Sequence, residues 1–275
     1  MQTPALSGLL GAIAAITAAA ASGVACADEP AGSESTAPVG TWAMRSVLGY
    51  TKTGGNTDNS AGNFLFHAAH VMGDWKLLFG GDALYGSTRG ETTSQAWDAY
   101  LQGNYNITPR FYWYLGASYT DDRFSGFAYQ TALKTGAGYK FIDSDATRLT
   151  AQLGFGRRWL QPEILVRDDI GAVISRTKLE ATSDWIADGG VVFEHNFNTS
   201  TKVLAGVTVQ AGEDNILTSA SVALQVKMSE RLALSAGYRL VDNSNPPQGS
   251  GRRDSLTTLG LVYELKNDKL SPEPQ

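Results

Sequence analysis

Features that mark several common protein classes are scarce in this sequence. Cys26 is the only cysteine among the 275 residues, so the chain cannot form an internal disulfide. The 22 basic residues are outnumbered by 27 acidic ones and are not clustered. A phosphate-binding surface needs clustered cations, and nucleic acid is therefore not expected as a partner.

Long hydrophobic runs are also missing beyond residues 1–27. No uncharged apolar stretch there approaches the ~18 residues that a membrane-spanning helix needs. Stretches with the 3.6-residue period of an amphipathic helix are missing too, whereas period-two alternation recurs from 41 to 266. The chain is therefore predicted to be all-β.

The first residues have the pattern of a secretory signal peptide. Leu6 to Ala27 carry no charge, Leu9 to Ile16 are mostly apolar, and an Ala-Cys-Ala site precedes Asp28. No Lys or Arg precedes the apolar stretch, which departs from the usual pattern. The alternative is lipidation of Cys26, although Gly23 stands where a lipoprotein signal usually carries Leu. Cleavage after Ala27 is predicted, leaving a mature chain without thiols.

Four segments are predicted in the chain. A signal peptide at 1–27 is followed by a flexible lead-in at 28–40, a β-domain at 41–266 and a polar tail at 267–275.

Apolar and polar residues alternate along each predicted strand of the β-domain. Trp75, Leu77 and Phe79 share one face of a strand, whereas Lys76 and Asp82 lie on the other. In each strand the charged residues fall on one parity. A soluble lipocalin-like barrel would show the same alternation, so this pattern alone does not decide between water and lipid.

Three further features favour a barrel in a membrane. The polar faces are rich in small residues with sparse charges of both signs, and aromatic residues lie near the ends of the apolar faces, as Phe111 and Tyr119 do. Connections also alternate in length. The short ones are 73–74, 106–110, 142–147, 198–201 and 228–231, and the longer polar ones are 53–60, 87–92, 120–128, 157–183, 212–215 and 242–254.

This alternation predicts a single antiparallel up-and-down transmembrane β-barrel of about 12 strands, with short periplasmic turns and both termini periplasmic. The first pair, 41–51 and 61–72, alternates least regularly, which leaves 10 or 14 strands open.

Several runs in the β-domain resemble a known family. They are Thr53–Asn59, Gly73–Trp75, Asp122–Phe127, Gly136–Lys140 and Gly154–Arg158. The sequence resembles proteins described as salt-induced outer-membrane proteins, a family otherwise known as a domain of unknown function. The Asp-Arg-Phe-Ser-Gly run is the most specific part. The resemblance covers most of 41–266 and implies a barrel in the outer membrane without any stated activity.

Two partners follow from this location: the lipid bilayer and the barrel-assembly machinery. That machinery recognises an aromatic residue at the end of the last strand in many barrels. Here the last strand is expected to end near Lys266, with 267–275 following, so Tyr263 would have to act as an internal signal.

No catalytic residue, metal site or cofactor is predicted. His67 and His70 are three apart on a strand, so they point to opposite faces and cannot share one ion. A phospholipase-like enzyme with His67 or His195 as base on the lipid-facing wall is an alternative, but no Gly-x-Ser-x-Gly motif is present. Loop aspartates lack the spacing of an EF-hand calcium site.

The glycine pairs Gly136/Gly138 and Gly154/Gly156 lack a strand-to-helix context, so we interpret them as lumen-facing residues rather than phosphate cradles. Arg123 and Phe124 are expected to pack a loop onto the barrel rim.

The function predicted is non-enzymatic: envelope integrity, or passive passage of small solutes through a narrow lumen. The predicted lumen-lining charges are Asp82, Asp98, Lys134, Arg148, Asp188 and Arg239. Because both signs occur, these groups could pair across the lumen and close it. A lipid-acting enzyme and a soluble periplasmic ligand-binding barrel remain the alternatives.

Overall fold

The computed structural model describes residues 40–53, 59–169, 173–248 and 250–265. The predicted signal peptide, nearly all of the lead-in and the polar tail lie outside these residues and stay predictions. All regular elements in the described ranges are strands: β1(Trp42–Thr53), β2(Asn59–Met72), β3(Trp75–Thr88), β4(Glu91–Asn106), β5(Phe111–Asp122), β6(Phe127–Asp143), β7(Thr147–Arg167), β8(Val173–Lys178), β9(Thr182–Asn196), β10(Thr201–Ala211), β11(Ile216–Lys227), β12(Leu232–Asn243) and β13(Arg253–Leu265). No helix in these ranges has the length and apolar character needed to cross a membrane.

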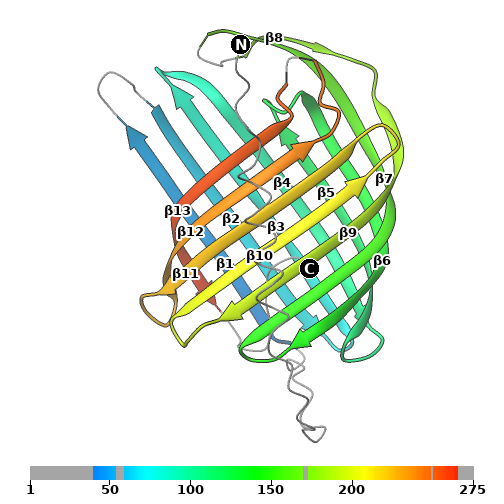
Figure 1. The fold of residues 1–275 in the computed structure, drawn as a ribbon, viewed down its shortest axis with the longest axis vertical. Coiled ribbons are helices and arrows are strands. Elements are labelled where there is room, and N and C mark those ends of the chain that lie inside the picture. The colour runs from blue at the N-terminus through cyan, green and yellow to red at the C-terminus, as the bar shows by residue number, and fades with distance from the viewer. Residues whose placement is uncertain (1–39, 54–58, 170–172, 249, 266–275) are drawn as a thin grey trace, which may run out of the picture. The chain divides into compact units, whose positions relative to one another are not determined.

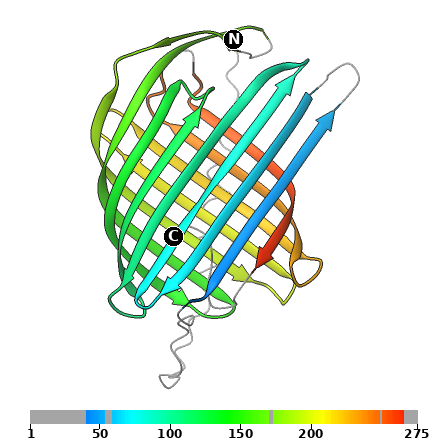
Figure 2. The same ribbon diagram turned by 180° about the vertical axis from the view of Figure 1, so that it is seen from behind.

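Twelve of the strands close into one antiparallel barrel. Neighbours in the chain pair with each other, β7 pairs with β9, and β1 closes the circle by pairing with β13 from Met44↔Leu265 to Gly49↔Gly260. β8 pairs only with the distal part of β7. The strands run obliquely around the barrel in both views (Figures 1 and 2). The predicted up-and-down barrel of about 12 strands is confirmed.

The two faces of the wall differ in polarity. Large apolar side chains cover the outer face, where Leu153 is 73% exposed and Leu259 is 68% exposed. Polar side chains face the interior, which we call the lumen, and Asp188 and Gln225 are each only 2% exposed there. Because successive residues of a strand point to opposite faces, the period-two pattern of the sequence produces this division directly.

β1 and β2 alternate less regularly because apolar side chains also occupy their inner face. Val47 from β1 and Leu65 from β2 pack inside the barrel with Val262 and Ala233. Ala43, Ala69, Val71 and Leu78 form a second inner cluster nearby. Both strands are therefore apolar on two sides, and their pairing partners, rather than their periodicity, fix their place in the wall.

The barrel has two distinct ends. We call the end with the connections 73–74, 107–110, 144–146, 197–200 and 228–231 the turn end, and the opposite end the loop end. All five short connections match the prediction. The loop predicted at 87–92 is wrong: β3 and β4 meet in a two-residue turn, in which Arg89 and Gly90 have φ of 52° and 84°.

The long loop predicted at 157–183 is also wrong. β7 continues to Arg167 and forms a hairpin with β8, which lies over the loop end in Figure 1. The guanidinium groups of Arg167 and Arg176 lie 5.4 and 5.9 Å from the ring of Phe124, and both donate to backbone oxygens of the 123–126 connection. In this part of β7 the buried Glu163 and Leu165 share one face, so the alternation of polar and apolar faces that marks the barrel strands is lost.

Candidate functional site in the lumen

The lumen of the barrel holds charged side chains that meet across it. Arg239 on β12 contacts Asp82 on β3, with Nη1 3.4 Å from Oδ2. The strands β13, β1 and β2 separate these two in the sheet, so the contact can form only through the interior. Asp98 lies directly opposite Asp82 in the register of β3 and β4.

A second group lies around Asp188 on β9. Lys134 Nζ on β6 is 2.9 Å from Asp188 Oδ1, and the Tyr114 hydroxyl on β5 donates to Oδ2 at 3.2 Å. Three strands of one half of the wall thus converge on one carboxylate that is 2% exposed. A buried carboxylate needs such a full set of partners because its desolvation is costly.

His67 belongs to the lumen and His70 to the outer wall. His67 Nε2 lies 2.9 Å from Asp82 Oδ1, and its ring contacts Tyr100 edge-on. His70 instead stacks on Trp42, with ring centroids 4.1 Å apart. The two imidazoles are therefore on opposite faces, as their spacing predicts. The described part of the chain contains no group of three His, Cys, Asp or Glu side chains that could hold a metal ion.

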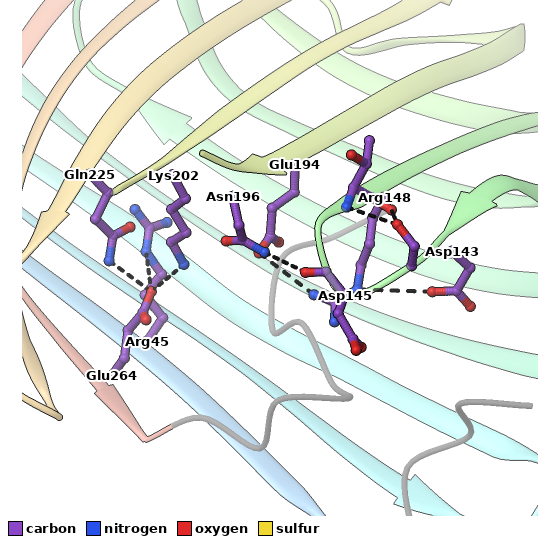
Figure 3. Close-up of polar contacts among 11 residues, drawn as sticks. Arg45, Asp143, Asp145, Arg148, Glu194, Asn196, Lys202, Gln225 and Glu264 are labelled. Carbon is purple, nitrogen blue, oxygen red and sulfur yellow. Dashed lines mark hydrogen bonds and ion pairs between the residues drawn. The ribbon is translucent and has the colours of Figure 1, made fainter. Parts of the chain in front are cut away.

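At the turn end, Glu264 on β13 collects three partners (Figure 3). Its Oε1 accepts from Lys202 Nζ at 2.8 Å and from Gln225 Nε2 at 3.0 Å, and it lies 3.7 Å from Arg45 Nε. These side chains come from β10, β11 and β1, so the contacts tie together strands that are distant in the chain.

On the other side of the turn end, Arg148 lies between two carboxylates. It is 3.6 Å from Glu194 and 3.9 Å from Asp143, and Lys140 is 3.8 Å from Asp143. Figure 3 shows this group beside the Glu264 group. Of the residues in these two groups, only Arg148 was among the predicted lumen charges. The remaining residues of the two groups lie at the alternate positions of each strand that carry its polar residues, so this alternation is the sequence signal that could have identified them.

Glycines make room for aromatic side chains along the inner wall. A Cβ at Gly138 would clash with the phenol end of Tyr112, and one at Gly154 would clash with the Tyr114 hydroxyl. Tyr112 and Tyr114 are 1% and 0% exposed. Their rings pack against the backbone of β6 and β7 at Gly138 and Gly154, where no side chain is in the way. We interpret these glycines as a platform for the two tyrosines.

Near the loop end the lumen contains another buried cation. Arg158 on β7 is 2% exposed and donates through Nη2 to Asp184 on β9 at 2.8 Å and to the Asn215 carbonyl at 3.3 Å. This group fixes the connection between β10 and β11 to the wall.

Comparison with known proteins gives the family of the chain. Residues 47–265 match the family described as "Protein of unknown function, DUF481". The chain belongs to this family. The match confirms the resemblance to a domain of unknown function, whereas salt induction stays a prediction. A relative from Escherichia coli (strain K12), "Uncharacterized protein YdiY", is 28% identical over 221 residues, which are 79% of this chain and 81% of the relative.

Solved structures resemble this DUF481 protein at low identity. The NanC porin is 11% identical with a TM-score of 0.44, over 80% of this chain and 100% of that one. The translocator domain of autotransporter NalP from Neisseria meningitidis is 13% identical with a TM-score of 0.42, over 81% and 86%. Structural similarity at this sequence identity and TM-score does not establish the function of the DUF481 chain.

Part of the lumen remains open to water. Thr208, Ser221 and Arg239 lie on the inner parity of β10, β11 and β12, yet all three are exposed. On the opposite wall, Tyr112, Tyr114 and Asn104 are almost completely buried. The packed side chains therefore occupy one side of the lumen more than the other.

Proposed function

We propose that this protein is an outer-membrane barrel that lets small polar solutes pass through its lumen. The observation that carries the location is the polarity of the wall. A barrel in water places its apolar side chains inside, whereas here Trp97, Leu224 and Leu234 are among the many exposed on the outer face and the ion pairs lie inside. Such an outer face would be unstable in water and favourable in lipid.

Aromatic side chains near strand ends support the same location. Trp75, Tyr105 and Tyr263 are exposed at the turn end, and Tyr50, Tyr85 and Trp185 lie toward the loop end. Two such girdles are typical of barrels that sit between two membrane-water interfaces. We propose that the chain reaches this membrane through its predicted signal peptide and is inserted by the barrel-assembly machinery.

The exposed inner side chains of β10 to β12 support passage, since they offer a wet, uncrowded path beside the packed wall. The second candidate function is structural. It is favoured by the ion pairs inside the barrel, because Lys134–Asp188 and Arg239–Asp82 would narrow or close a path.

Single-channel recording in planar bilayers decides between the two. We expect small, defined conductance steps from the folded wild type, and larger steps from Arg239→Ser, because this change removes a side chain that crosses the lumen. Arg231→Ser is the matched control, since Arg231 is exposed in a connection at the turn end. Absence of steps from protein that shows the heat-modifiable gel migration of a folded barrel would reject passage and leave the structural role.

Location is tested separately. Native protein should fractionate with outer membranes and remain there after carbonate washing. Recovery in the soluble periplasmic fraction would instead support the ligand-binding barrel.

For the alternative of a lipid-acting enzyme, His195 is the remaining candidate for the general base on the lipid-facing wall. His67 points into the lumen, whereas His195 stacks with Phe193 and its Nδ1 lies 2.8 Å from the Thr147 hydroxyl. If His195→Ala protein retains whatever lipid turnover the wild type shows, this alternative fails.

The resemblance to salt-induced proteins adds a hypothesis about regulation. Protein abundance should rise when external NaCl increases and should not rise with sucrose of equal osmolarity. An unchanged abundance in both media would contradict it.

A further inference from the structure

A ring of charged side chains encircles the lumen at the turn end. Its members lie within four residues of a strand end and have the inner parity: Arg45, Lys76, Lys140, Arg148, Lys202, Lys227, Asp143, Glu194 and Glu264. We call this set the turn-end ring. Six cations face three carboxylates, which leaves a net charge of +3.

The charges of the ring are unevenly shared. Arg45 and Lys202 both form ion pairs with Glu264. Lys140 and Arg148 both contact Asp143, and Arg148 also contacts Glu194. Every carboxylate of the ring is thus already in contact with at least one cation.

Among the described residues, Lys76 and Lys227 are the members without an ion pair of their own, and of these two only Lys76 is partly buried. Within the described ranges Lys76 makes no hydrogen bond or ion pair with another residue, although it lies within electrostatic range of two cations and two carboxylates: Lys140, Arg148, Asp143 and Glu194. Three cations therefore approach one another on the β3 to β7 side of the lumen. Their field is not fully cancelled by Asp143 and Glu194.

Neutral groups beside Lys76 add to this positive potential. Asn104 is directly opposite Lys76 in the register, and Tyr112 follows on the next strand, two positions along from Tyr114, which is opposite Asn104. Asn104 accepts from Gln102 through Oδ1, but its Nδ2 and the Tyr112 hydroxyl have no acceptor among the described residues. Buried donors without acceptors leave their positive ends uncompensated.

We infer that the turn-end ring gives the lumen a preference for anions, and that Lys76 is the residue that sets this preference. The inference rests on the proposed passage of solutes and names their class: small solutes that carry a carboxylate or phosphate group. Rings of Lys and Arg select anions because they lower the electrostatic barrier to an anion's entry and raise it for a cation.

The middle of the lumen opposes this preference to a smaller extent. Asp82, Asp98 and Asp188 outnumber Lys134 and Arg239 there by one. Of the turn-end ring and the middle group, the ring is therefore the electropositive one. An anion that enters from the turn end meets the ring before the middle group.

Reversal potentials in a KCl gradient test the preference. We expect the wild type to be more permeable to chloride than to potassium. Lys76→Gln should reduce the chloride-to-potassium permeability ratio by about two-fold or more, and Lys76→Glu should reduce it further. Lys178→Gln is the matched control because Lys178 is exposed on β8, outside the ring. Equal ratios for the wild type and both Lys76 variants would overturn the inference, as would cation preference of the wild type.

A second measurement does not depend on conduction. Inorganic phosphate or acetate should raise the unfolding temperature of the detergent-folded wild type at constant ionic strength, because a ligand that binds only the folded state stabilises it. Lys76→Gln should lose at least half of that rise, and Tyr112→Phe should lose part of it while keeping or raising the stability without ligand. A rise with phosphate but not with acetate would restrict the class to phosphates.

The two proposals can fail separately. A wild type without conductance steps but with an anion-dependent rise that needs Lys76 rejects passage and keeps the anion site. Conductance steps with equal permeability ratios and no such rise keep passage and reject the anion site.

Discussion

Lys134 and Asp188 form an ion pair inside the barrel, with Nζ 2.9 Å from Oδ1, although β7 separates their strands. Their side chains are 17% and 2% exposed. Three strands separate Arg239 and Asp82, whose pair therefore reaches farther through the interior, but Arg239 is 46% exposed. The two pairs differ most in their access to water, which makes their energies unequal.

We expect Asp188→Asn to lower the free energy of unfolding by roughly 3 kcal/mol, because it leaves the Lys134 ammonium without its counter-charge in a buried place. Asp82→Asn should cost less than about 1 kcal/mol, since water screens its partner Arg239 and an amide can still hydrogen-bond to His67. Urea unfolding of protein folded into lipid vesicles, followed by tryptophan fluorescence, measures both. Equal losses would show that burial does not distinguish the two pairs.

The glycine platform predicts a second contrast. Gly138→Ala should destabilise the barrel by about 1–3 kcal/mol, because the new methyl group would displace the buried ring of Tyr112. Gly103→Ala should be nearly neutral, since a Cβ there would lie 3.5 Å from Trp75, an ordinary contact. The same unfolding assay compares them. If Gly138→Ala leaves the free energy of unfolding unchanged, the Tyr112 ring can move aside without losing its packing.

The lipid-facing wall predicts a dependence on depth. Leu259→Arg, in the middle of β13, should cost about 2–4 kcal/mol, and Leu265→Arg, at the end of β13, about 0–1 kcal/mol. Both side chains are on the outer face, at 68% and 41% exposure. Unfolding in vesicles measures the costs. Two small costs would mean that the outer wall does not face hydrocarbon.

The amino terminus of the mature protein is predicted to be Asp28, because cleavage is expected after Ala27. Intact-mass measurement of protein purified from membranes checks this. A mature chain that begins at Cys26 and carries the mass of attached acyl chains would instead establish the lipoprotein alternative. Ala25→Arg should block cleavage at the predicted site, and a precursor should accumulate.

Much of the wall could be predicted from local sequence. Residues on one strand alternate between two faces regardless of what surrounds them, so the parity of Trp75 and Lys76 is fixed before the chain folds. Tight turns such as Gly73-Asp74 are equally local. For these reasons the all-β class, the approximate strand number and the five short connections follow from the sequence alone.

The alternation of polar and apolar residues failed as a guide to strands where the two faces of a strand do not divide into one polar and one apolar face. β1 and β2 are apolar on two sides because Val47 and Leu65 pack inside the barrel. Beyond the rim, the end of β7 and β8 were predicted as part of a long polar loop, because Glu163 and Arg167 share a face with the buried Leu165 and the polar/apolar alternation is lost. Neither case can be resolved from the period of a single strand, since it depends on what lies next to it in space.

The sequence by itself determined which side chains share a face of each strand, because that alternation is a property of the backbone. Only the tertiary structure decided which of these side chains meet. Closure of β1 onto β13 brings Arg45 and Glu264 together at 3.7 Å across 219 residues of chain. The adjacency of β5, β6, β7 and β9 gives Asp188 its lysine and its tyrosine, whereas Lys76 makes no ion pair or hydrogen bond with any described residue. These partnerships depend on the circular order and stagger of the strands, and no local pattern encodes them.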